Sequence, residues 1–226
     1  MNTLKSLVRT FQQTHIRTIV LATMACVLGG SGISADEGLD CTMGTSGTNT
    51  DPAIKVPSDA EGWELLPKTV SGGGQPLPIW ARAVAVHLPR TAAAMLKLDY
   101  AQRTASPVNP ILRAKMRWVV AHTNHCEYST AYALADLKRA GASPEAIATL
   151  TGPAEKWPEE DRKPLEFARL LTVAAPTIQD QLFEDLRIKY GENQVASMVL
   201  LAAYGNFQDR IVLGLQLPME ETGPLA

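Results

Sequence analysis

The sequence lacks the features that mark several large functional classes. It has three cysteines in 226 residues, and only 6% of its residues are aromatic. It contains no glycine-rich loop for a phosphate, no nucleophile-elbow serine and no Walker motif, so those chemistries are not indicated. Basic residues form no stripe, so nucleic acid is not expected as a partner. No stretch alternates apolar and polar residues over the length of a strand, so no sheet is predicted.

The first 35 residues have the layout of a secretory signal peptide. Three basic residues and no acidic residue precede an apolar run at residues 19–28, and small residues follow up to Ala35. This order predicts cleavage after Ala35 and export to the periplasm or out of the cell. The alternative is an uncleaved anchor in the membrane, although the run is shorter than the ~20 residues of a comfortable span. Lipoprotein modification at Cys26 is less favoured because Thr23 and Met24 are poor lead-in residues.

The segment after the signal peptide is predicted to be a flexible linker, residues 36–55. Gly, Thr, Ser and Asn dominate it, and they carry too little apolar surface to offset the entropy of ordering. In an oxidising compartment its Cys41 could pair with Cys126, and two independent thiols are the alternative. Residues 36–226 hold 18 basic and 23 acidic residues. They contain no further run that could span a bilayer, so this part is expected to be soluble.

The folded domain is predicted over residues 56–220, with a short tail at 221–226, and its pattern is helical. Pro78 suits the first turn of a helix from Ile79 to about His87, and Pro89 suits the start of the next. Apolar residues recur at three- and four-residue spacing in residues 111–120 and again in 131–137. This spacing is typical of buried helix faces.

The later part of the domain is also helical. Ser143 is expected to cap a helix, and Gly191 is expected to end an amphipathic helix that begins at Gln179. The last helix, about Asn193 to Leu215, is apolar on nearly all sides, so it needs a central position or a partner subunit. The sequence therefore predicts an all-α bundle of about six to eight helices, and we favour a homo-oligomer.

Reactive side chains gather at one predicted helix junction. Four of them lie within six positions: His122, His125, Cys126 and Glu127. If Thr123 or Asn124 caps the second helix, Cys126 falls in its first turn, where free backbone N–H groups and the helix dipole favour a thiolate. A protonated His125 would act in the same direction, and Glu127 would oppose it. A thiolate attacks peroxides and disulfides, whereas the alternative is a packed, inert cysteine.

The same cluster has residue types that could also bind a metal. Its histidines, cysteine and glutamate have ligand chemistry, but His122 and His125 share a side only on one continuous helix. A zinc site usually needs three or four converging ligands, and no second cluster is visible in the sequence. No metal and no cofactor are therefore predicted, and His87 is expected to be an ordinary histidine.

Four stretches in order resemble the carboxymuconolactone decarboxylase / alkylhydroperoxidase D-like family. They are Pro76–Ala83 (similar to Leu-Pro-Asn-x-x-Arg-Ala), Cys126–Gly141 (similar to Cys-Glu-Tyr-Cys, a histidine and a helix ending in Lys-Ala-Gly), Ser143–Ile147, and Tyr204–Arg210 (similar to Tyr-x-Asn-x-x-x-Arg). The resemblance runs from about Val56 to Glu220. It implies an all-helical fold assembled as dimers, trimers or hexamers.

The resemblance also implies a set of reactive residues. The alkylhydroperoxidase branch uses a Cys-x-x-Cys pair, a downstream histidine and an upstream glutamate. Here Cys126 matches the first cysteine, but the second falls on Ser129, the histidine on Ala133 and the glutamate on Ala114. Ser129 cannot resolve an oxidised Cys126 as a disulfide. His125 or His122 would have to replace the missing base.

Three functions follow as expectations. The first is a thiol-dependent, peroxiredoxin-type peroxidase in which Cys126 reduces a peroxide and an external thiol or Cys41 resolves it. The second is a non-catalytic binding or scaffold protein that kept the bundle and lost the relay. The third is a lyase that acts on a small lactone acid. The expected partner is a peroxide or small organic acid.

Overall fold

The computed structural model describes residues 51–70 and 75–225, and the statements below concern these residues. They contain eight α-helices, two short 3-10 helices and no strand, so the all-α prediction is confirmed. The signal peptide, Cys41 and most of the predicted linker lie outside the described residues. Within the described part of the chain, no helix is long and apolar enough to cross a membrane.

The helices follow the predicted breaks closely. In chain order they are α2 (Asp59–Leu65), α3 (Ile79–His87), α4 (Pro89–Thr104), α5 (Pro110–Thr123), α6 (Glu127–Arg139), α7 (Pro144–Thr151), α8 (Glu159–Val173) and α9 (Asp180–Gly214), with 3-10 helices at Ala154–Lys156 and Ala175–Thr177. Ser143 caps α7 by accepting a hydrogen bond from the amide of Ala146, as predicted. After α6 the chain reverses at Gly141, which has φ 84° and is therefore in the left-handed region.

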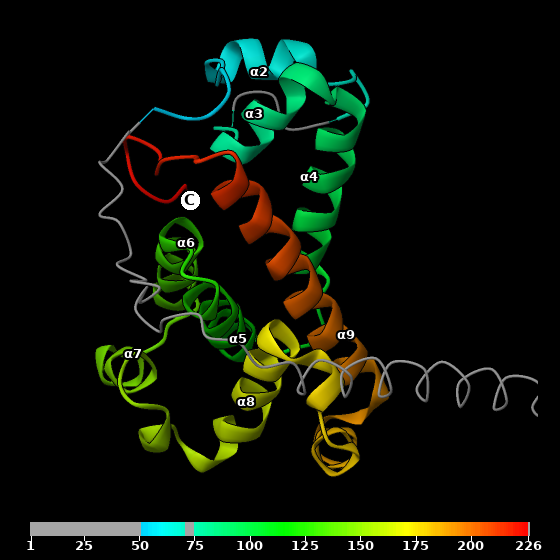
Figure 1. Cartoon of the computed structure of the whole chain (residues 1–226), viewed down its shortest axis with the longest axis vertical. Coiled ribbons are helices and arrows are strands. Elements are labelled where there is room, and N and C mark those ends of the chain that lie inside the picture. Colours follow the sequence, from blue (N-terminus) through cyan, green and yellow to red (C-terminus); the bar gives the residue numbers. More distant parts are fainter. Residues whose placement is uncertain (1–50, 71–74, 226) are drawn as a thin grey trace, which may run out of the picture. The chain divides into compact units, whose positions relative to one another are not determined.

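The main core surrounds α5. This helix contacts α6, α8 and α9 (Figure 1), and fully buried side chains from all four helices meet there, including Met116, Leu137, Phe167 and Met198. α5 and α9 approach closely because position 205 is a glycine. A Cβ added at Gly205 would lie 3.2 Å from Val120 Cγ1 and 3.3 Å from Arg117 Cδ. The all-round apolar character of the last helix is thus explained in part by its buried contact with α5.

A second core lies where α3, α4 and α6 meet the carboxyl-terminal end of α9. It contains Trp80, Met95, Cys126, Tyr128 and Val212. The segment after α9 packs here too, through Leu217 and Met219. Residues after the last helix therefore pack against residues near the start of the domain.

The last two predicted helices, which were separated at Gly191, form one helix with a break in the structure. α9 spans both of them, but Gly191 inside it has φ 76° and ψ 163°, which is not helical. This conformation is available essentially only to glycine. Gly191 therefore ends the first segment, as predicted, and redirects the chain into the second.

Candidate functional site

The predicted helix junction exists, but its capping differs from the prediction. Neither Thr123 nor Asn124 caps α6, because Asn124 is the C-cap of α5 and Cys126 itself is the N-cap of α6. The chain turns at His125, which has φ 55°. The Asn124 side chain instead donates hydrogen bonds to Asn206 and Asp209 on α9, at 2.8 and 2.9 Å. The turn is thus held by polar contacts inside the bundle.

Cys126 is buried in an apolar environment. It is 1% exposed and belongs to the second core. Its Sγ donates to Ser129 Oγ at 3.5 Å, and it is a free thiol. Burial raises the pKa of the Cys126 thiol, and hydrogen bonding with Ser129 only partly offsets this effect. A position at a helix start alone would be expected to lower this pKa, so the shift is in the opposite direction.

The two histidines of the cluster do not converge with Cys126. His122 is exposed at the end of α5, where its ring stacks on Trp118 with a centroid distance of 4.6 Å. His125 is also exposed. Among the described residues, no hydrogen bond links either imidazole to the sulfur, and no three metal-ligating side chains gather anywhere. The histidines are therefore not placed as bases for Cys126 in this structure.

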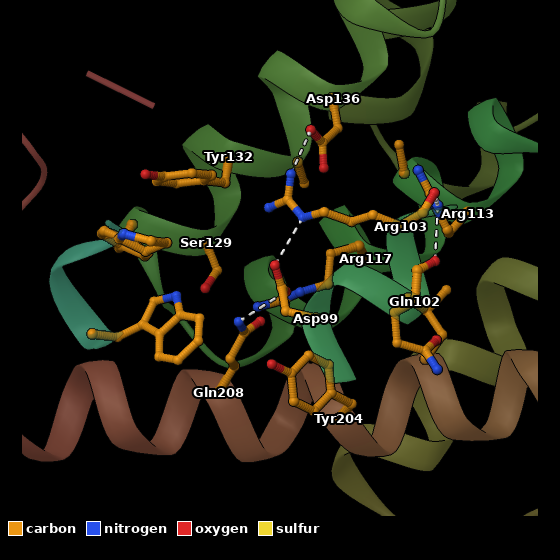
Figure 2. Close-up of a pocket in the computed structure, with 16 residues that line it drawn as sticks. Asp99, Gln102, Arg103, Arg113, Arg117, Ser129, Tyr132, Asp136, Tyr204 and Gln208 are labelled. Atoms are coloured by element: carbon orange, nitrogen blue, oxygen red, sulfur yellow. Dashed lines mark hydrogen bonds and ion pairs between the residues drawn. The ribbon is translucent and has the colours of Figure 1, made fainter. Parts of the chain in front are cut away.

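The positions of the missing relay residues meet at one cavity. Ala114 on α5 and Ser129 and Ala133 on α6 all line a cavity of about 60 Å³, which we call the inner chamber. Figure 2 shows Ser129 among the residues of its wall. Cys126 is not among the lining residues. The residues that the resemblance pointed to are therefore brought together, but with one hydroxyl and two methyl groups in place of a thiol, an imidazole and a carboxylate.

Charged residues line the other side of the inner chamber. Arg103 on α4 lies between Asp99 and Asp136 (Figure 2), with Nε 3.0 Å from Asp99 Oδ2 and Nη1 3.5 Å from Asp136 Oδ1. These carboxylates raise the pKa of Arg103 even though burial opposes the charge. Arg117 on α5 is paired with the fully buried Asp209, whose Oδ2 accepts a hydrogen bond at 3.2 Å. Both cations are therefore neutralised by aspartates.

Arg113 differs from the other two arginines. Its Nη1 donates to the backbone carbonyls of Gln102, at 2.8 Å, and of Arg103, at the end of α4 (Figure 2). Among the described residues, no carboxylate forms an ion pair with Arg113 within 4.0 Å. Burial lowers the pKa of Arg113, since its charge is partly desolvated without a paired acid.

Aromatic residues line the chamber, and the carboxyl-terminal segment contacts one of them through Glu220. Trp80, Tyr128, Tyr132 and Tyr204 contribute to its wall. Glu220 is 7% exposed, and its Oε1 accepts hydrogen bonds from Tyr128 at 2.7 Å and from the Ile79 amide at 2.9 Å. Burial raises the pKa of Tyr128 strongly and that of Tyr132 to about 12. Both tyrosines are therefore neutral hydrogen-bonding groups.

A larger cavity, the outer chamber, adjoins the inner one. It has a volume of about 730 Å³, and apolar side chains of Trp63, Leu77, Leu96 and Tyr100 contribute to its lining. Pro78, Asp99, Arg103 and Tyr132 line both chambers. The two spaces thus share one wall.

Sequence reasoning missed most of the residues that define these chambers. Arg103 and Asp99 are spaced for an ion pair on one helix turn, but nothing local indicates that they face Asp136 on α6. Asp209 lies inside the motif Tyr204–Arg210, yet its burial against Arg117 depends on the close approach at Gly205. These residues could be placed only after the helices were packed.

Comparisons with solved structures show the same fold. The chain is similar to an alkylhydroperoxidase AhpD core, an uncharacterized peroxidase-related protein from Ralstonia eutropha, with TM-score 0.62 and 17% identity over 76% of this chain and 93% of that one. An uncharacterized peroxidase-related protein from a Silicibacter species gives TM-score 0.59 and 18% identity over 66% of this chain and 79% of that one.

A third similar structure is a variant of the debrominase Bmp8 in complex with 2,3,4-tribromopyrrole. It gives TM-score 0.56 and 15% identity over 64% of this chain and 78% of that one. No protein-family model and no curated protein matches the chain. At these identities the comparisons show that the chain has the AhpD-like helical fold.

Proposed function

We propose that this protein is a small-molecule-binding member of the AhpD-like fold that does not use a cysteine relay. The observation that carries the proposal is the placement of Ala114, Ser129 and Ala133 around one cavity while Cys126 lies outside its lining. The cavity lies between α5 and α6, and its walls offer hydrogen-bonding and charged groups and no redox pair.

Peroxide reduction by Cys126, the first expectation from the sequence, has less support from the geometry. The nucleophile in that reaction is a thiolate that the peroxide can reach. The Cys126 sulfur is buried and its thiol pKa is raised, so both the reactive form and access are disfavoured. Ser129 supplies a hydrogen-bonding hydroxyl but no second sulfur.

The thiol test compares wild-type protein with Cys126→Ser. Both are incubated with hydrogen peroxide or an organic hydroperoxide and an excess of dithiothreitol, and peroxide loss is followed over time. We expect equal rates, each at the level of the reductant alone. Catalytic peroxide loss that depends on Cys126 would restore the peroxidase hypothesis.

The binding test fills the cavity. Ala133→Val adds two methyl groups to the wall of a space of about 60 Å³, so a molecule that occupies it should be displaced. A panel of small organic compounds is screened by thermal shift, and hits are measured by calorimetry with wild type and variant. Ala94→Val, on the exposed side of α4, is the matched control. Ala114→Val serves if Ala133→Val does not fold, and unchanged binding in the cavity variants would contradict the proposal.

We also propose that the protein is exported. The arrangement of basic, apolar and small residues in positions 1–35 supports this. Expression of the full chain followed by mass spectrometry of the secreted or periplasmic fraction should give a product that starts at Asp36. A product that keeps residue 1 and sediments with membranes would favour the uncleaved anchor.

A further inference from the structure

The inner and outer chambers share part of their lining. Arg103 and Tyr132 belong to both linings, as does Asp99. Arg103 is held by carboxylates from α4 and α6, and Tyr132 accepts a hydrogen bond from the Leu225 amide at 3.2 Å. A molecule in the outer chamber would therefore contact the same side chains as a molecule in the inner one.

The outer chamber suits the apolar body of a ligand. Its volume of about 730 Å³ falls within the roughly 300–1,000 Å³ that is typical of small-molecule sites. Its apolar lining includes Tyr100, which is 70% exposed although it is a large side chain. Covering such a ring would remove apolar surface from water, which favours binding of an apolar group.

The charges around the two chambers favour an acidic head group. Four cationic residues line the chambers, Lys97, Arg103, Arg113 and Arg117, against two anionic residues, Asp99 and Asp136. Arg103 and Arg117 are already paired with aspartates. Arg113 is fixed by backbone carbonyls through Nη1, which leaves its remaining N–H groups for a ligand. A guanidinium presents a planar set of donors that matches a carboxylate.

We propose that the two chambers form one binding site for a small amphipathic organic acid. Its apolar body occupies the outer chamber beside Tyr100, and its carboxylate reaches Arg113 in the inner chamber. This inference rests on the proposed function and adds to it the chemical class of the ligand. Where the two chambers adjoin, the ligand lies along Arg103 and Tyr132, which line both.

The test uses 2-naphthoate and its neutral analogue 2-naphthamide, which share one shape and differ in charge. Binding to the full chain is measured by calorimetry, with quenching of tryptophan fluorescence as a second readout. We expect 2-naphthoate to bind at least tenfold more tightly than the amide, because charge-assisted hydrogen bonds to arginine are worth about that factor or more. Equal affinities, or no binding of 2-naphthoate, would overturn the inference.

Two variants locate the head and the body of the ligand. Arg113→Gln should weaken binding of 2-naphthoate about tenfold or more and leave that of the amide unchanged. The matched control is Arg210→Gln, an exposed position on α9. Tyr100→Ala should weaken both probes because it removes apolar contact in the outer chamber. If Arg113→Gln or Tyr100→Ala binds 2-naphthoate like wild type, the assignment of that chamber is wrong.

The failure of this inference can be distinguished from failure of the proposed function. If compounds from the general panel are displaced by Ala133→Val but 2-naphthoate does not bind, the cavity is a ligand site for another class of molecule. If the panel gives no hit that Ala133→Val displaces, and Cys126 supports peroxide turnover, the proposed function itself is wrong.

Discussion

Cys126 and Asp209 are both fully buried, but their surroundings differ. Cys126 lies among apolar side chains with one weak hydrogen-bond partner, whereas Asp209 is paired with Arg117 and accepts a further bond from Asn124. An apolar pocket favours the neutral thiol. The buried Asp209 carboxylate has an opposite charge and hydrogen-bond donors next to it, which compensate for its removal from water. The two residues therefore lead to different predictions.

The Cys126 thiol should react slowly with alkylating reagents. Wild-type protein is treated with iodoacetamide over a range of pH, and modification of the Cys126 peptide is followed by mass spectrometry. We expect the rate to rise only above the ordinary thiol pKa, because burial raises the pKa of Cys126. Protein unfolded in urea is the control and should react readily. Rapid modification of the folded protein at neutral pH would contradict the burial of the sulfur.

Asp209→Ala should destabilise the domain severely. It leaves the Arg117 guanidinium without its paired carboxylate in the bundle, and such changes cost about 3–5 kcal/mol. Chemical denaturation measures the free energy of unfolding. Glu184→Ala is the control, because the Glu184–Arg187 pair on α9 is exposed and should change stability little. Equal losses from the two substitutions would show that burial of the pair is unimportant.

Single elements are determined largely by local residues. The helix limits predicted at Pro78, Pro89, Ser143 and Gly191 coincide with helix starts or a break in the structure. The junction before α6 was predicted less well, because a cysteine N-cap without a side-chain hydrogen bond has no clear sequence signal. The chambers depend on contacts between helices, so their charged walls could not be predicted from local pattern.

The break in α9 gives a prediction at this scale. Gly191→Ala should lower the free energy of unfolding by about 1–3 kcal/mol, since alanine is strained at φ 76° and ψ 163°. No atom lies within 4 Å of a Cβ added there, so the loss would be conformational and not steric. Gly214→Ala has the same open surroundings without a left-handed φ and should cause no loss. If Gly191→Ala leaves the free energy of unfolding unchanged, the kink can be straightened without cost.

The whole molecule should lose stability in strongly alkaline solution. The pKa of Tyr132 is raised from 10.0 to about 12, chiefly by burial. Between those values the unfolded chain gives up this proton and the folded chain keeps it, so unfolding becomes more favourable as pH rises. Denaturant midpoints at pH 8 and pH 11 measure the loss. Tyr132→Phe should reduce it, whereas Tyr100→Phe, at an exposed ring, should not.

Homo-oligomer formation remains a prediction at the scale of the molecule. Five exposed large apolar side chains lie on α9: Phe183, Ile188, Leu200, Phe207 and Leu213. Leu200 and Phe207 are seven residues apart and so lie on the same side of the helix. Light scattering after size-exclusion chromatography should give a mass above 24.4 kDa for the full chain. Leu200→Glu with Phe207→Glu should lower that mass, and a monomeric wild-type protein would contradict the prediction.

The contact between Glu220 and the Ile79 amide joins positions 141 residues apart. The ribosome produces the chain from the amino terminus. The Ile79 amide and the Tyr128 hydroxyl therefore have no Glu220 acceptor until synthesis is almost complete. A polypeptide that ends before residue 220, through premature termination or proteolysis, would leave both donors unsatisfied. Loss of the last few residues would therefore destabilise the start of α3, which lies near the other end of the domain in sequence.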